Sequence, residues 1–249
     1  MTNRRSGLAE AATLTAVLLA YSNGLGWWVQ RRGKSQDSLF HTLNPAALVG
    51  MLFYAHRRHV HLGSLGIRRQ GIGKSLVWGT ILGVALSGPP LLFFYKPILL
   101  DTPLEYGPVR SMSQREMLQD VLVRVPVSIA LLEELAFRGL LYTFLRRQIS
   151  ARSTIALTSL AFAGWHFTVT ASSAAQTNIG EAARLPRFLK AYVKPLSVAG
   201  GMLATGLAGV GFGLLRERTD NLAGPALAHW IVDSTMICAL WLKKPELKG

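Results

Sequence analysis

The segment Ile72–Tyr95, which reads IGKSLVWGTILGVALSGPPLLFFY, carries one charged side chain, that of Lys74. An α-helix needs about 20 apolar residues to cross the hydrocarbon core of a bilayer, and this segment is long enough. Comparable apolar stretches recur along the chain, at Leu8–Trp28, Leu39–Ala55, Leu118–Leu145, Thr154–Thr170, Leu196–Leu215 and Leu222–Leu242. The sequence therefore predicts an all-α fold, a polytopic membrane helix bundle of about seven (six to eight) transmembrane helices.

Composition supports one membrane domain. The 249 residues are 50% hydrophobic and 16% charged, and no linker or composition shift divides them, so residues 1–249 are expected to form a single domain. Cys238 is the one cysteine, which leaves a packing role as its default. Small residues recur every four positions at Gly201, Thr205, Gly209 and Gly213, a pattern that allows close helix packing. The alternative is the general glycine enrichment of membrane helices.

The basic side chains indicate which partners the protein meets. The net charge of +14 would suit nucleic acid, but the Lys and Arg residues stand in short clusters at the ends of apolar stretches. These clusters are Arg4-Arg5, Arg31-Arg32, Arg57-Arg58, Arg68-Arg69, Arg146-Arg147 and Lys243-Lys244. This placement favours anionic lipid headgroups as partners and argues against nucleic acid. We expect an integral, multi-pass protein, located in the cell membrane of a prokaryote.

Charged residues inside one apolar stretch point to a functional site. Residues 131–139 read LLEELAFRG, and a charge at the centre of a membrane helix costs roughly 2.5–3.5 kcal/mol on insertion scales. Glu134 and Arg138 are one helical turn apart, which predicts an ion pair within the helix. Glu133 points about 100° away from Glu134 and is expected to find its partner on another helix.

Two other apolar stretches offer that partner. Phe162 and His166 share one helix face, and so do His229 and Asp233. Counted from the basic loops at Arg146, Arg152 and Arg218, the residues Glu133, His166 and His229 lie ~20, ~21 and ~17 Å deep at ~1.5 Å per residue. Such similar depths favour a single buried site. Trp165 and Trp230, beside the two histidines, are expected to be packing residues that could also line a groove.

In this arrangement the sequence resembles the CPBP family of intramembrane proteases, which comprises CAAX prenyl proteases of type II, bacteriocin-processing proteins and abortive-infection proteins. The resemblance covers a motif-bearing core of about residues 118–242. It rests on three motifs in the family's order, EExxxR at Glu133, Glu134 and Arg138, FxxxH at Phe162 and His166, and HxxxD at His229 and Asp233. Gly139 also fits, while position 233 is Asp where well-studied members have Asn.

The resemblance implies an intramembrane endopeptidase that acts on a membrane-associated protein or peptide. It implies that Glu133 is the general base, that His166 helps to hold the water, and that His229 and position 233 form an oxyanion hole. Glu134 and Arg138 would fix the helix, although a purely structural ion pair is the alternative for them. An ionised Asp233 cannot donate a hydrogen bond, so it would instead orient and charge His229.

The catalytic type and the function class stay open at this stage. Two histidines, two glutamates and an aspartate could ligate Zn²⁺, yet the chain lacks an HExxH segment, so both a glutamate-type and a metal-dependent enzyme are considered. No other cofactor is expected. A non-catalytic membrane scaffold or bacteriocin-immunity-type protein of the same fold is the main alternative. A proton-relaying transporter is the third, although no inverted repeat supports it.

Overall fold

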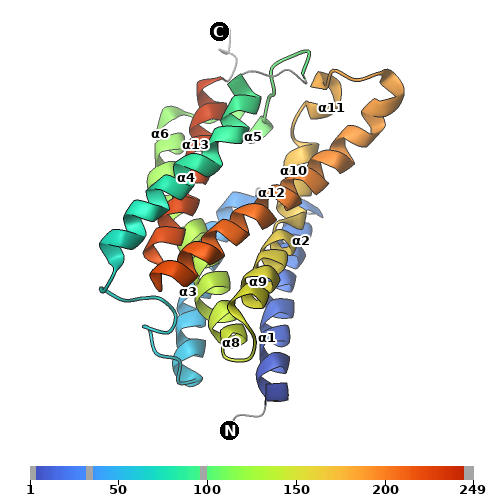
Figure 1. Ribbon diagram of the computed structural model, residues 1–249. Helices are drawn as coiled ribbons and strands as arrows, with labels where there is room; N and C mark the ends of the chain where they lie inside the picture. Colours follow the sequence, from blue (N-terminus) through green and yellow to red (C-terminus); the bar gives the residue numbers. More distant parts are fainter. Residues whose placement is uncertain (1–3, 32–35, 96–99, 244–249) are drawn as a thin grey trace.

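The computed structural model describes residues 4–31, 36–95 and 100–243, and they form a bundle of helices (Figure 1). Within these residues no strand occurs, only the isolated bridges Leu100 to Ala183 and Tyr106 to Thr177. The α-helices are α1 (Arg4–Leu19), α2 (Leu25–Arg31), α3 (Gln36–Arg57), α4 (Ile72–Tyr95), α5 (Gly107–Arg110), α6 (Gln114–Gln119), α7 (Leu131–Glu134), α8 (Tyr142–Arg146), α9 (Ala151–Trp165), α10 (Phe167–Ala175), α11 (Ile179–Ala182), α12 (Lys190–Thr219) and α13 (Ala223–Leu242). The segments η1 (Ala20–Gly24), η2 (Asp120–Ala130) and η3 (Leu135–Leu141) are π-helical, and η4 (Arg187–Leu189) is a 3₁₀ turn.

The all-α prediction is confirmed for the described residues, since every predicted apolar stretch is built of helices, with a break at His166 within Thr154–Thr170. By length and composition three of the described helical segments can cross a membrane, namely Ile72–Tyr95, Arg187–Thr219 and Ala223–Leu242. Apolar side chains on α4, including Val77, Ile81 and Val84, are exposed on the outside of the bundle, as contact with lipid requires. The count of about seven spans stays a prediction. Arg32 and Lys244 of the predicted basic clusters lie outside the described residues.

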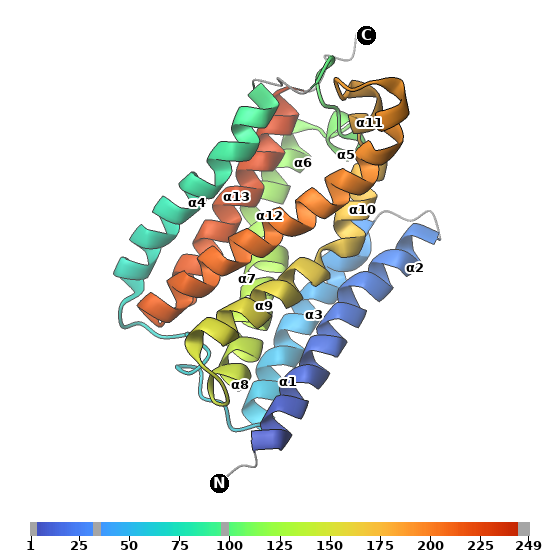
Figure 2. The same cartoon turned by 45° about the vertical axis from the view of Figure 1, so that its right-hand side comes forward.

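Helices α4 and α13 run side by side along one flank of the bundle (Figure 2). A Cβ atom on Gly79 would lie 2.4 Å from the carbonyl oxygen of Gly224, so only glycine allows this approach. Gly224 and Pro225, at the start of α13, are buried against α4, because Ser75 Oγ accepts the Gly224 N–H at 2.9 Å. The start of α13 is thus enclosed by protein, and the helix carries His229 into the interior.

Helix α12 crosses the bundle obliquely and packs on α9 (Figure 2). A Cβ on Gly213 would lie 3.0 Å from Ile155 Cγ2, and one on Gly209 would lie 3.3 Å from Ser159 Cα. On α10, Thr170 Cγ2 would be 2.4 Å from a Cβ on Gly201. The predicted ladder of small residues therefore brings α12 against α9 and α10.

The centre of the bundle is one continuous helical run from Gln114 to Arg146, made of α6, η2, α7, η3 and α8. It begins with a capping box, in which Ser113 and Glu116 satisfy each other's backbone N–H groups. Residues 132–145 are all buried, and α7 contacts both α3 and α13. This run places the two adjacent glutamates at the middle of the molecule.

Candidate active site

Glu133 lies at the point where three elements meet. Its Oε1 accepts a hydrogen bond from Trp165 Nε1 at 3.0 Å, and its Oε2 lies 3.5 Å from His166 Nε2 and 3.8 Å from His229 Nε2. Among the described residues, no donor hydrogen-bonds to Oε2. Oε1 of Glu133 is therefore held by Trp165. Oε2 faces two imidazole nitrogens and can accept a proton or a hydrogen bond from a water.

Glu134 makes the predicted ion pair, with Arg138 Nη1 at 2.9 Å from its Oε1, and both side chains are fully buried. The same oxygen lies 3.1 Å from His229 Nδ1. Since a carboxylate only accepts, Nδ1 of His229 carries the hydrogen in this contact. Glu134 thus connects the central helix to α13 in addition to its pairing with Arg138.

Arg138 is held by aromatic rings on its remaining sides. Its Cζ lies 4.2 Å from the ring centre of Phe162 and 5.1 Å from that of Phe212, which are cation–π distances. A Cβ on Gly209 would lie 3.0 Å from Arg138 Nη2, so this glycine makes room for the guanidinium. Phe162 of the FxxxH motif therefore packs on the buried Arg138, and Gly209 of the small-residue ladder leaves the space that its guanidinium needs.

His166 stands at a break between two helices, because α9 ends at Trp165 and α10 begins at Phe167. Its Nδ1 is 2.8 Å from the carbonyl oxygen of Phe162, which can only accept. The hydrogen must therefore lie on Nδ1, and in the neutral ring the Nε2 lone pair faces Glu133. The four-residue spacing of the FxxxH motif is explained by this contact.

His229 is buried, and its ring stacks on Phe212 at 5.4 Å and 21°. Its Nε2 lies 3.4 Å from Asp233 Oδ2, one turn further along α13, and the Asp233 side chain is 34% exposed. Acceptors thus lie beside both ring nitrogens of His229. The structure brings together all six predicted residues, Glu133, Glu134, Arg138, His166, His229 and Asp233, within one connected set of contacts.

A metal site is not evident in this set. Within residues 4–31, 36–95 and 100–243, no group of three or more His, Cys, Asp or Glu side chains could hold a metal ion. Structural and catalytic zinc sites need three or four such ligands around one point. The use of a divalent metal such as Zn²⁺ by the site residues stays a prediction.

Two residues in the site were not foreseen from the sequence. Trp165 packs as expected, 5.5 Å from the ring of Phe137, but it also donates the hydrogen bond to Glu133. Arg216 is buried and donates to the Arg138 carbonyl oxygen at 3.2 Å and to the Ser64 carbonyl oxygen at 2.8 Å. For Trp165 the one signal in the sequence was its position next to the motif histidine His166. Arg216 carried no such signal, because in the sequence it resembles a surface arginine at a helix end.

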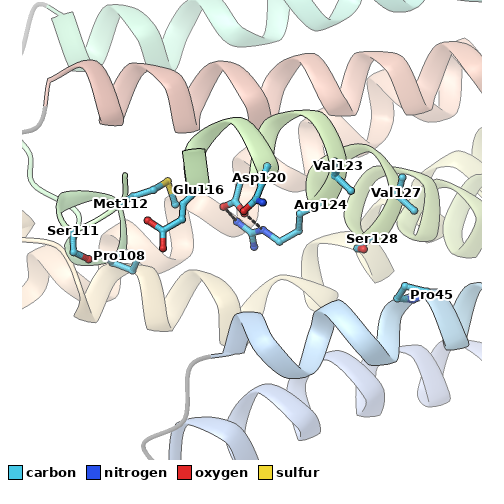
Figure 3. Close-up of a pocket in the computed structure, with 11 residues that line it drawn as sticks. Pro45, Pro108, Ser111, Met112, Glu116, Asp120, Val123, Arg124, Val127 and Ser128 are labelled. Carbon is cyan, nitrogen blue, oxygen red and sulfur yellow. Dashed lines mark hydrogen bonds and ion pairs between the residues drawn. The ribbon is translucent and has the colours of Figure 1, made fainter. Parts of the chain in front are cut away.

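A pocket of about 680 Å³ opens between α3 and the helical run of α6 and η2 (Figure 3). Asp120 and Arg124 face each other on one wall, and Pro45 of α3 stands on the other. The lining extends to Ser128, whose carbonyl oxygen accepts from Asn44 Nδ2 at 2.6 Å. Asn44 Oδ1 in turn accepts from the hydroxyl of Tyr21, whose ring stacks on Trp165. A series of contacts thus connects the pocket lining with Trp165, which holds Glu133.

Together, membrane-length helices and a buried centre of carboxylates, histidines and an arginine define a polytopic membrane protein with a buried polar site. Residues 119–235 match the model of the family described as type II CAAX prenyl endopeptidase Rce1-like. The matched segment contains all six site residues, and the match confirms the resemblance to the CPBP family. The protein is thus a protease-like integral membrane protein. No curated protein and no solved structure matches the chain.

Proposed function

We propose that the protein is an intramembrane endopeptidase of the CAAX-protease-like type, in which Glu133 activates a water that hydrolyses a peptide bond. The observation that carries this proposal is the convergence of His166 Nε2 and His229 Nε2 on Glu133 Oε2, at 3.5 and 3.8 Å. Both separations exceed a direct hydrogen bond, and a water that bridges the groups would satisfy them. The family match over the same residues supports a protease.

In the first step, a water between Glu133 and His166 gives a proton to Glu133 Oε2 while its oxygen attacks the substrate carbonyl carbon. The Nε2 lone pair of His166 accepts the second hydrogen of the water, which fixes the direction of attack. Trp165 holds the other carboxylate oxygen of Glu133 at 3.0 Å, so the base keeps its orientation. The carbon then carries a tetrahedral oxyanion.

His229 is placed to stabilise that oxyanion. Glu134 accepts from its Nδ1, and Asp233 lies beside its Nε2, so the ring can carry a hydrogen on each nitrogen. An Nε2–H group would donate to the oxyanion, and such a bond is most effective from a buried donor such as His229. Asp233 acts here as an acceptor that orients and charges His229. Glu133 finally returns its proton to the leaving amine as the C–N bond breaks, which yields a carboxylic acid and an amine.

The substrate class follows from the surroundings of the site. The pocket between α3 and η2 combines exposed apolar side chains, Val123 and Val127, with the charged pair Asp120 and Arg124. Such a mixed wall suits an extended peptide segment that is attached to the membrane and enters from the side. Anionic lipid headgroups are the proposed partners of basic helix ends such as Arg57 and Arg58, and the proposed location is the cell membrane of a prokaryote.

The decisive experiment offers purified protein in nanodiscs a library of lipidated and unlipidated membrane peptides. Wild type is compared with Glu133→Gln, and Glu181→Gln, a change at an exposed glutamate of α11 that does not line the pocket, is the matched control. Cleavage by wild type and the control, lost in Glu133→Gln and unaffected by a chelator, is the expected result. Loss of cleavage with the chelator would bring a metal into the mechanism. No cleavage by any folded form would favour the non-catalytic scaffold.

A further inference from the structure

The helix break at His166 is bridged by a side chain from the first helical run. In a continuous α-helix the Thr168 N–H would donate to the Gly164 carbonyl oxygen, four residues earlier. Instead, Thr168 N–H donates to Asn23 Oδ1 at 3.0 Å, and Asn23 Nδ2 donates to the Gly164 oxygen at 3.0 Å. The amide of Asn23 therefore stands between the two groups and satisfies both, as a peptide group would.

A neighbouring residue completes this contact. Ser22 is buried, and its hydroxyl donates to the carbonyl oxygen of Trp165 at 2.8 Å. The Thr168 hydroxyl adds a bond to Asn23 Oδ1 at 2.9 Å. Buried backbone groups without partners are costly, so a break at this depth requires such substitutes. The π-helical turn η1 supplies them from consecutive positions.

The same turn also reaches the glutamate. Tyr21 stacks on Trp165 with ring centres 5.9 Å apart and an interplanar angle of 23°, and Trp165 donates to Glu133. Three successive residues, Tyr21, Ser22 and Asn23, thus contact the chain on both sides of His166. Single π-helical turns inside α-helices are frequent at functional sites, which agrees with the position of this one.

The break controls how His166 is oriented. At the break the His166 N–H donates to the Ala163 oxygen at 3.1 Å, three residues back rather than four. The Phe162 oxygen, which would accept that N–H in a regular helix, accepts His166 Nδ1–H instead at 2.8 Å. That bond sets the tautomer and turns Nε2 toward Glu133. Closing the helix would remove the bond and release the ring.

We propose that Asn23, supported by Ser22, is a positioning residue of the catalytic site, whose inserted amide keeps the helix open at His166 and so holds the water-binding nitrogen opposite Glu133. This inference rests on the proposed function for its catalytic consequence. It assigns a role in the site to a residue outside the matched segment 119–235. The catalytic geometry would then depend on the first helical run as well as on the motif-bearing helices.

The test compares Asn23→Ala and Asn23→Asp with the control Thr15→Ala, whose hydroxyl bonds to Ala11 within the same helical run. Asn23→Asp keeps the acceptor for Thr168 and loses the donor to Gly164. We expect Asn23→Ala to lower kcat by about 10- to 100-fold with little change in KM, as displaced supporting groups do. Asn23→Asp should be intermediate, and Thr15→Ala should match wild type.

A second readout does not depend on cleavage. Nitrogen-15 NMR of labelled histidines, with the His166 signals identified by their loss in His166→Gln, reports the ring tautomer. Wild type should show hydrogen on Nδ1, and Asn23→Ala should show a mixture of tautomers. Unchanged ring signals and unchanged kcat in folded Asn23→Ala would overturn the positioning role. Absence of cleavage by wild type would count against the proposed function, and the tautomer measurement would still decide whether Asn23 orients His166.

Discussion

His229 Nδ1 lies 3.1 Å from Glu134 Oε1, the same oxygen that accepts from Arg138 Nη1 at 2.9 Å. The second glutamate of the motif therefore has two partners, one on its own helix and one on α13. Its neighbour Glu133 instead faces the two imidazole Nε2 atoms. The adjacent glutamates thus have different roles. Glu134 joins two helices, and Glu133 takes part in the proposed chemistry.

Substitutions of the two glutamates should affect stability differently. Glu134→Gln should destabilise the fold by about 3–5 kcal/mol, because it leaves the buried Arg138 charge without its counterion. Glu133→Gln should change stability far less, since the residue keeps its acceptor for Trp165. Denaturant unfolding in detergent measures both, and the double variant Glu134→Gln with Arg138→Met should lose less than the sum of the single changes. Equal stability of the two single variants would contradict the assignment.

Trp165→Phe tests the hydrogen bond to the proposed base. The variant keeps a ring against Phe137 but removes the donor at 3.0 Å from Glu133 Oε1. We expect kcat to fall by about 10-fold or more, with a similar KM, because the carboxylate loses the contact that orients it. The matched control is Trp230→Phe, which removes a comparable donor, to the Val121 oxygen, away from Glu133. An equal fall in both variants would point to packing alone.

Gly209→Ala tests the space beside the arginine. The new methyl group would lie 3.0 Å from Arg138 Nη2 and 3.3 Å from Ser159 Cα, so α12 or the guanidinium must move. A cost of about 1–3 kcal/mol is expected from overpacking. Gly200→Ala on the same helix meets no atom within 4 Å and should be neutral or slightly stabilising. The denaturant midpoints of unfolding of the two variants measure this difference. A higher midpoint for Gly209→Ala than for Gly200→Ala would contradict the prediction.

Substitutions of Asp233 test whether a hydrogen-bond acceptor beside His229 is sufficient for cleavage. Asp233→Asn keeps an oxygen that can accept from His229 Nε2, and asparagine is the residue of well-studied family members. We expect cleavage rates within about 10-fold of wild type for this variant and a fall of about 100-fold for Asp233→Leu, which removes the acceptor. Steady-state kinetics with one cleaved peptide measure both. Full activity in Asp233→Leu would remove this residue from the site.

Much of the site could be predicted because its signals are local. Glu134 and Arg138 are one turn apart, and a helix brings such a pair together wherever it lies. Glu133 pointed elsewhere for the same geometric reason, which required partners on other helices. Trp165 and Arg216 were harder, because a packed indole and a hydrogen-bonding indole look alike in sequence, and so do a surface and a buried arginine.

The sequence by itself determined the helices and the charged groups that had to be buried, since both follow from the length of apolar stretches and the spacing of side chains along one helix. Only the tertiary structure decided how closely Glu133 approaches the two histidines, that Glu134 reaches His229, and that Asn23 enters the break at His166. These contacts join residues far apart in the chain. They depend on how the helices are rotated and how closely they approach one another. Glycines at helix contacts and π-helical turns set this rotation and approach, and they lie far along the chain from the site residues that they position.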